Sequence, residues 1–334
     1  MRFLPSTIIS LIFFVALPAY ANKTSSPESL KSKFITEQVK NGMTHKEVTS
    51  ILEKAHYQQT IINSISRPWE AKPWHQYYPI FLTDSRLEAG LAFWKKHKNV
   101  INRAAKKFDV DPQVIVAIIG VETYYGKHLG KHSVLDALYT LGFYYPPRAT
   151  FFRGQLADLL KLVKEENLDI NNLNGSYAGA MGYGQFIPSS YRHYAVDFDG
   201  NGSRDLIGSP TDAIGSVANY LHKHGWQKGM PTTIELINNS DSTPETTPWH
   251  GERLKLKAAD ILTPKLHLKH SVDIDIAQPA MLVELQQKKN KEYWLGLKNF
   301  YVITRYNHSP LYAMAVYQFS QQLKQSYEKQ PDEK

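Results

Sequence analysis

The segment from Asp111 to Gly126 constrains the fold most, because it predicts a continuous and strongly apolar helix. Asp111 before Pro112 is typical of a helix start, since aspartate accepts from free backbone amides and proline fits the first helical position. Gly126 is a typical C-terminal stop. The apolar residues between them follow helical spacing: Val114, Ile115, Ile118, Ile119 and Val121. Neighbouring segments share this periodicity, so we expect a mainly α fold.

Glu122 is the acidic residue inside this helix. It follows Ile118 by four positions and Ile115 by seven, so the three side chains are expected on one helix face. A carboxylate on an apolar face loses hydration, which would raise its pKa and suit a general acid. The alternative is an ordinary glutamate near a helix end whose carboxylate reaches solvent. The helix alone leaves both interpretations open.

The rest of the chain divides by composition and periodicity, and 334 residues are enough for two or three packed lobes. Residues 231–292 contain Thr-Pro pairs and alternating stretches, among them a strand-like segment at 271–276. The expected parts are a signal peptide (1–21), a flexible leader (22–30), a helical lobe (31–110), a helical core (111–230), a small strand-containing insertion (231–292), the C-terminal part of the core (293–326) and a tail (327–334).

The N-terminus has the pattern of a cleavable secretory signal. Arg2 precedes an apolar run from Ile8 to Leu17, and small residues flank Tyr20 before a cleavage point after Ala21. The run is short for a membrane span, and no later stretch approaches the required length of about 20 apolar residues. An uncleaved anchor is the alternative. We expect export to the periplasm, with no transmembrane span once the signal is removed.

The chain contains no cysteine. This excludes disulfides, thiol catalysis and cysteine-based zinc sites, and it removes the residue to which an envelope protein's lipid anchor is attached. We therefore expect a periplasmic protein that is not lipid-anchored. The net charge of +8 favours a polyanionic partner, but nucleic acid is not expected in that compartment. We expect a monomer.

Four motifs in order resemble those of the B-type lytic murein transglycosylases, the membrane-bound lytic murein transglycosylase B family of the lysozyme-like superfamily. The similarity spans roughly residues 30–320, and four ordered motifs are far more specific than one. They are residues 120–126 (GVETYYG), 175–190 (GSYAGAMGYGQFIPSS), 212–220 (DAIGSVANY) and 299–308 (NFYVITRYNH).

The resemblance implies a lysozyme-like helical core with added lobes and one catalytic glutamate, Glu122, where many glycosidases use two carboxylates. The glutamate would protonate the bond between N-acetylmuramic acid and N-acetylglucosamine in peptidoglycan glycan strands. It would then act as base toward the muramoyl C6 hydroxyl, closing a 1,6-anhydro ring without a catalytic cofactor. The 175–190 motif contains no acidic residue, which is compatible with a single acid.

Six further residues are candidates for the substrate cleft. Ser176 and Gln185 have hydrogen-bonding groups for a sugar, and Phe186 would form an apolar wall. The resemblance also implies that Tyr220, Asn307 and Tyr312 line the cleft. Each of these residues has a structural alternative, because glycine- and alanine-rich segments pack helices tightly and buried Tyr or Asn often only satisfy the backbone.

Residues 197–212 resemble a calcium-binding loop. Oxygen-bearing side chains alternate as in the first half of an EF-hand, with Gly202 at the sixth position, but Gly208 stands where the final glutamate belongs. The resemblance to B-type members with a longer loop implies Asp212 as the last ligand, with Asp205 a second candidate. A structural Ca²⁺ is therefore predicted, and an ion-free Asx-turn loop is the alternative. The ligands would be Asp197, Asp199, Asn201, Ser203 (through its carbonyl) and Asp212.

Two other functions stay open at this stage. A hydrolytic muramidase would admit water to the same bond, and no motif separates it from a transglycosylase on first principles. A non-catalytic peptidoglycan-binding protein would keep the fold without the chemistry, although Glu122 on an apolar helix face argues against it.

Overall fold

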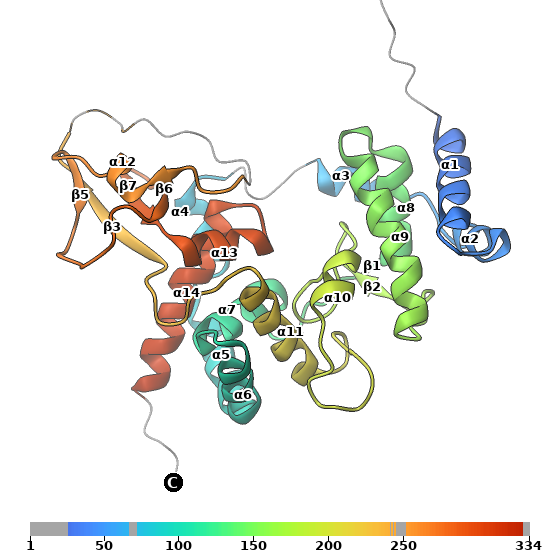
Figure 1. Cartoon of the computed structure of the whole chain (residues 1–334), viewed down its shortest axis with the longest axis horizontal. Coiled ribbons are helices and arrows are strands. Elements are labelled where there is room, and N and C mark those ends of the chain that lie inside the picture. Colours follow the sequence, from blue (N-terminus) through green and yellow to red (C-terminus); the bar gives the residue numbers. More distant parts are fainter. Residues whose placement is uncertain (1–25, 67–71, 241, 243, 245–251, 330–334) are drawn as a thin grey trace, which may run out of the picture.

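The computed structural model describes residues 26–66, 72–240, 242, 244 and 252–329, and it confirms a mainly helical chain with a small sheet (Figure 1). The predicted signal peptide lies outside the described residues. The α-helices are α1 (Pro27–Lys40), α2 (His45–Leu52), α3 (Gln59–Ile65), α4 (Trp74–Tyr77), α5 (Asp84–Lys96), α6 (Lys98–Phe108), α7 (Pro112–Thr123), α8 (Val134–Tyr144), α9 (Ala149–Glu165), α10 (Pro188–Tyr194), α11 (Pro210–Lys223), α12 (Ala258–Ile261), α13 (Lys298–Tyr306) and α14 (Pro310–Glu328). Short 3₁₀ turns lie at η2 (Tyr78–Ile80) and η3 (Pro146–Arg148).

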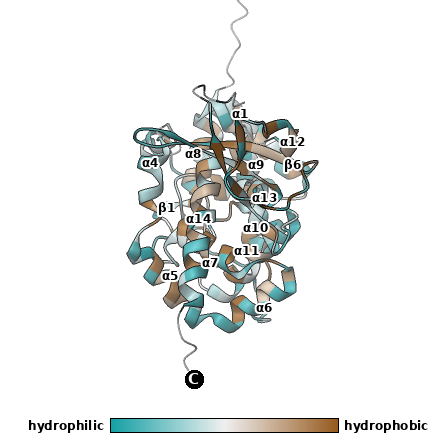
Figure 2. Ribbon diagram, turned by 90° about the vertical axis from the view of Figure 1, so that its left-hand side faces the viewer, coloured by the Kyte–Doolittle hydropathy of each residue, from teal (hydrophilic) through white to brown (hydrophobic). Residues whose placement is uncertain are grey.

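Helix α7 forms the centre of the core. It packs against α5, α6, α11 and α14, and nearly all of its residues are buried. The outer helices α5 and α6 alternate between polar and apolar residues in Figure 2, as expected for helices with one face toward the core. The C-terminal helix α14 reaches Glu328 and packs along α7.

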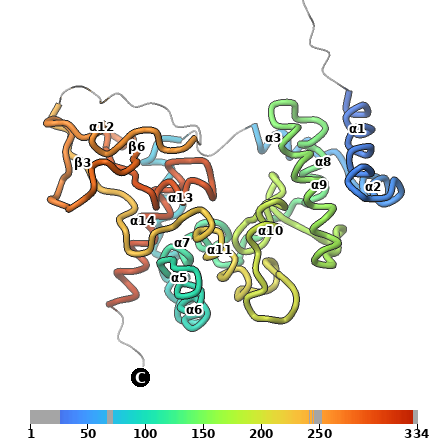
Figure 3. Tube along the Cα trace, viewed as in Figure 1, coloured from blue at the N-terminus to red at the C-terminus, as the bar shows by residue number. Residues whose placement is uncertain are grey.

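A separate lobe forms on the other side of the molecule. Helices α1, α2 and α3 lie beside α8 and α9, although residues 66–133 separate the two groups in the sequence (Figure 3). The prediction of one lobe over 31–110 is therefore wrong, because α5 and α6 belong to the core. Periodicity identifies the apolar face of each helix but not the helix against which that face packs.

The third part is a five-stranded antiparallel sheet with the order β4-β6-β7-β3-β5. A separate two-stranded ladder joins β1 to β2, and β1 contacts α8. The helix α4 packs on β6, which ties this part back to residues before the core. The strands are β1 (His132–Ser133), β2 (Asn174–Gly175), β3 (Thr233–Asn238), β4 (Leu256–Lys257), β5 (Leu266–Leu268), β6 (Pro279–Gln286) and β7 (Lys291–Gly296).

Three predicted boundaries and one predicted strand need correction. Helix α1 begins at Pro27, capped by the Ser26 side chain, so an irregular leader does not extend to residue 30. The helix α14 runs into the predicted tail, and β7 ends at Gly296, beyond the predicted limit of 292. Residues 271–276 form no strand, and Val272 and Ile276 are exposed. Alternation alone cannot form a strand without a neighbour for its backbone hydrogen bonds.

Candidate active site

Glu122 lies in the last turn of α7, where the helix ends three residues before the predicted stop at Gly126. The side chain is partly exposed, whereas Ile115 and Ile118 on the same helix are fully buried. At the other helix end, Asp111 does not cap the first turn. Its carboxylate accepts from Trp226 Nε1 at 2.9 Å and from the Gly229 amide at 3.1 Å.

The Glu122 carboxylate is held from behind by a phenol. Tyr312, in the first turn of α14, donates its hydroxyl to Glu122 Oε1 at 2.6 Å. Tyr312 is only 3% exposed, and burial together with the negative charge of Glu122 raises its pKa well above the usual value. Tyr312 therefore stays a neutral donor. It was predicted to line the cleft, but it lies beneath the carboxylate and is not among the cavity-lining residues.

A cavity of about 610 Å³ opens in front of Glu122. Its walls come from α7, the start of α9, the 175–190 segment, α11 and the end of α13, and Glu122 is the one acidic residue among the described residues that line it. The lining comprises Glu122, Arg148, Phe151, Phe152, Ser176, Tyr177, Ala178, Ala180, Gln185, Phe186, Ile187, Ser190, Tyr220, Arg305, Tyr306, Asn307 and His308.

The glycine-rich segment forms tight turns that bring three predicted residues to this cavity. Ser176 Oγ accepts from the amides of Ala178 and Ala180, at 3.3 and 3.1 Å, so the hydroxyl proton remains for a ligand. Gln185 has a left-handed backbone (φ 50°), and its amide nitrogen donates to the carbonyls of Leu129 and Gly182. Its side-chain oxygen is therefore the polar atom that remains for a ligand.

Phe186 and Tyr220 form an aromatic wall. Their rings lie 5.8 Å apart, edge to face, and Phe186 is 2% exposed. The Tyr220 hydroxyl donates to the carbonyl oxygen of Arg305 at 2.5 Å, and its ring stacks on His224 at 4.1 Å. Tyr220 thus supports the chain that leads into Asn307. Asn307 caps the C-terminus of α13, is partly exposed and lines the cavity.

Three basic residues that line the cavity, Arg148, Arg305 and His308, were not among the predicted site residues. Arg148 follows two prolines in η3 and stacks over the exposed ring of Phe151 at 4.5 Å. Arg305 and His308 flank Asn307, and burial followed by the charges of Arg305 and Arg148 lowers the pKa of His308. Arg305 and His308 were inside a quoted motif, but η3 carries no signal that distinguishes Arg148 from a surface arginine.

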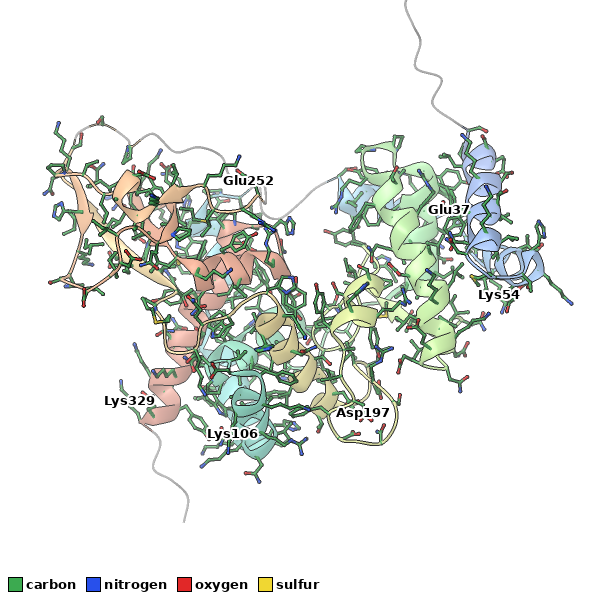
Figure 4. The ribbon with its side chains drawn as sticks, viewed as in Figure 1. Glu37, Lys54, Lys106, Asp197, Glu252 and Lys329 are labelled. Atoms are coloured by element: carbon green, nitrogen blue, oxygen red, sulfur yellow. The ribbon has the colours of Figure 1, made fainter. Side chains whose placement is uncertain are left out.

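The predicted calcium loop brings three carboxylates together. Oxygens of Asp197, Asp199 and Asp212 lie within 4.8 Å of one another, and Figure 4 marks Asp197 on this loop. Backbone amides of the loop surround Asp197, led by the amide of Gly202 at 2.8 Å, and they lower its pKa. The Asn201 side-chain oxygen accepts from the Ser203 amide at 2.9 Å. Clustered carboxylates with a further amide oxygen fit the hard-oxygen preference of Ca²⁺.

Asp212 closes this cluster from the first turn of α11. It is fully buried, and it accepts from the amides of Phe198 (2.7 Å), Asp199 (3.2 Å) and Asp205 (2.9 Å). Burial raises its pKa, and the three amide donors oppose that shift. The second candidate, Asp205, lies outside the cluster, since its carboxylate accepts from the amides of Ile207 and Gly208.

Known proteins resemble this chain over nearly its full described length. Residues 26–321 match the family described as the transglycosylase SLT domain, a range that includes both the cavity and the acidic loop. The chain is 41% identical over 300 residues to the membrane-bound lytic murein transglycosylase B of Escherichia coli strain K12, covering 86% of this chain and 81% of that protein.

Solved structures of lytic transglycosylases are also similar to this chain. The catenated lytic transglycosylase SltB1 of Pseudomonas aeruginosa has a TM-score of 0.83 and 41% identity, covering 91% of this chain and 99% of that one. The Escherichia coli lytic transglycosylase Slt35 in complex with calcium has a TM-score of 0.79 and 38% identity, covering 90% and 94%. Within the described ranges, no helix is both long and apolar enough to cross a membrane.

Proposed function

The chain belongs to the transglycosylase SLT domain family, and we propose that it cleaves the β-1,4 bond between N-acetylmuramic acid and N-acetylglucosamine in peptidoglycan. The products would be glycan strands with 1,6-anhydromuramoyl ends. The observation that carries this proposal is the single carboxylate, Glu122, among the described cavity-lining residues. Glycosidases that release a reducing end through water usually need two carboxylates on opposite sides of the bond.

Glu122 acts twice in the proposed reaction. In its protonated form it donates its proton to the glycosidic oxygen, the C1–O bond of the muramoyl residue breaks, and positive charge develops at C1. The resulting carboxylate then removes the proton of the C6 hydroxyl as O6 bonds to C1. This closes the anhydro ring and restores the protonated acid, so no water enters the product.

The surrounding residues bind and orient the sugars. We assign the hydroxyl of Ser176, the side-chain oxygen of Gln185 and the side chain of Asn307 to hydrogen bonds with hydroxyl and N-acetyl groups. Phe186 forms an apolar wall against a sugar face. Tyr220 supports the wall and the Arg305 backbone from its place in the cavity lining.

The acidic loop is assigned to a structural Ca²⁺. The carboxylates of Asp197, Asp199 and Asp212 would hold the ion, with Asn201 and the Ser203 carbonyl as further ligands, and its charge would offset their mutual repulsion. The calcium complex of Slt35 supports this assignment. We also propose a periplasmic location reached through the predicted signal peptide, without a lipid anchor.

Product analysis tests the proposed reaction. Purified sacculi are digested with the wild-type protein and with Glu122→Gln, and the new ends are identified by mass spectrometry. An anhydro end is one water lighter than a hydrolytic end, and we expect only anhydro ends from the wild type and almost no new ends from the variant. Reducing muramic acid ends would instead identify a muramidase. Normal solubilisation by Glu122→Gln would remove Glu122 from the mechanism.

A further inference from the structure

Arg86 reaches the end of the Glu122 helix from a neighbouring helix. It lies in the first turn of α5, which runs beside α7 (Figure 1). Its Nη1 donates to the carbonyl oxygen of Gly120 at 3.1 Å and approaches that of Val121 at 3.5 Å. The side chain is half-buried and is absent from the cavity lining. Arg86 therefore contacts the backbone just before Glu122 and is placed behind the substrate site.

A guanidinium suits this position for two physical reasons. The carbonyl oxygens in the last turn of a helix carry the negative end of the helix dipole, and each has a second lone pair that can accept a further hydrogen bond. Arg86 supplies both a hydrogen-bond donor and a positive charge to this end. The Gly120 carbonyl also accepts from the amide of Tyr124 at 3.1 Å, so this carbonyl connects Arg86 to the chain on both sides of Glu122.

The chain after Glu122 has an unfavourable conformation. Tyr124 (φ 51°), Tyr125 (φ 60°) and Gly126 (φ 86°) are successive left-handed residues, and this conformation is disfavoured for residues with a Cβ. Such backbone persists only where surrounding contacts impose it. Arg86 is one of these contacts, because its guanidinium lies over the Tyr124 ring at 5.1 Å.

The ring of Tyr125 makes a second contact that holds the left-handed segment, and two glycines leave the space for it. The hydroxyl end of the Tyr125 ring lies between α5 and α7, at Gly90 and Gly120. A Cβ added to either glycine would come within 2.3 or 2.4 Å of the Tyr125 hydroxyl oxygen. The Tyr125 ring fits between α5 and α7 only because both helices have a glycine where they cross. Its packing there holds the left-handed segment after α7 in place.

We propose that Arg86 is a positioning residue that sets the direction of the Glu122 side chain by holding the end of α7 and the left-handed segment after it together. Arginine is required because one planar group must donate to carbonyl oxygen while stacking on the rings of Phe81 (5.4 Å) and Tyr124. Lysine has the same charge but lacks a planar guanidinium group that can stack on these rings. The inference rests on the proposed catalytic role of Glu122.

Steady-state kinetics on soluble, uncrosslinked glycan strands test this role. In Arg86→Gln we expect kcat to fall about tenfold or more, since small displacements of a catalytic group are costly, while KM stays within about twofold. Arg86→Lys should fall between Arg86→Gln and the wild type in kcat. Should Arg86→Gln fail to fold, the lysine variant provides the same comparison.

Arg153→Gln is the matched control. Arg153 lies on α9 and donates Nη1 to the carbonyl of Gly142 at 2.8 Å in the last turn of α8, a helix without a catalytic group. We expect both glutamine variants to lower the melting temperature, but only Arg86→Gln to lower kcat. The inference is overturned if Arg86→Gln retains the kcat of Arg153→Gln, or if its loss lies in KM.

A double variant separates this inference from the proposed function. If Arg86 acts through Glu122, adding Arg86→Gln to Glu122→Gln should lower the residual rate no further. An additional tenfold loss in that background would show that Arg86 acts elsewhere. Full activity of Glu122→Gln alone would overturn the proposed function itself, whatever the Arg86 variants show.

Discussion

Glu122 and Asp212 are carboxylates at opposite kinds of helix end. Glu122 lies in the last turn of α7, where the helix dipole disfavours another negative charge, and it accepts a hydrogen bond from the phenol of Tyr312. Asp212 lies in the first turn of α11, where the dipole favours an anion, and it accepts from three backbone amides beside two other carboxylates.

The difference shows how the surroundings select the chemistry of a carboxylate. A carboxylate that accepts from a neutral phenol, faces an open cavity and lies at the negative end of a helix is suited to exchange a proton. A buried group with three fixed amide donors cannot move without breaking them, and its neighbouring carboxylates make a cation the natural partner. Variants that affect one region and spare the other test this contrast.

The largest effect is expected for Glu122→Gln. The variant keeps the side-chain shape but removes the exchangeable proton, so turnover should fall about 10³-fold, within the range for general acid–base groups. Its melting temperature, and the increase on adding calcium, should stay close to those of the wild type. Rates on glycan strands and thermal melts in calcium or chelator measure the two effects. A large loss of stability would show that Glu122 also has a structural role.

Asp212→Asn should reverse that pattern. It removes a charge that calcium compensates and turns an amide NH₂ group toward backbone donors, so the free energy of unfolding in calcium should fall by about 2 kcal/mol. Calcium should no longer raise the melting temperature. Asp205→Asn is the matched control, because Asp205 lies outside the carboxylate cluster and asparagine can still accept from Ile207 and Gly208. An equal loss of the calcium response in both variants would contradict the assigned ligands.

Tyr312→Phe should lower kcat about tenfold, since a hydrogen bond to a charged group contributes about 1.5–3 kcal/mol. KM should change little because Tyr312 does not line the cavity. Tyr191→Phe is the control. Tyr191 is a fully buried phenol that donates to the Arg204 carbonyl, so its loss should lower stability and leave kcat unchanged. A kcat unaffected by Tyr312→Phe would remove the phenol from the mechanism.

The smallest expected effect is a pH dependence of the calcium response. Burial raises the pKa of Asp212 above 3.8 in the calcium-free folded protein, so ionised Asp212 opposes folding increasingly as pH rises through that pKa. Calcium requires the ionised form and relieves this penalty. The increase in melting temperature on adding calcium should therefore grow from pH 4 to pH 7. A constant increase would indicate that Asp212 is not a ligand.

Local patterns predicted local structure correctly. The helix around Glu122 and the alternating acidic residues of the loop could both be predicted, because each depends on neighbours a few positions away. Prediction from the sequence failed where a partner had to be identified. Asp111 was expected to cap its own helix, but it accepts from Trp226 and Gly229, more than a hundred residues away.

In the candidate active site, too, the sequence predicted which residues are present but not which partners they have. Ser176, Gln185, Phe186, Tyr220 and Asn307 all reach the cavity, but their hydrogen bonds divide them between ligand-facing and supporting positions. No pattern separates those roles. They depend on which atoms other segments of the chain have already occupied, and that is decided only when the segments meet.

The sequence by itself determined that a glutamate lies near the end of an apolar helix and that acidic residues alternate in one loop, since spacing of a few residues sets both. The tertiary structure decided the rest. It divided residues 31–110 between two lobes, placed Tyr312 beneath Glu122 and aimed Arg86 at the end of α7. The physical reason is that periodicity defines which face of a helix is buried, whereas its partner depends on packing of the whole chain.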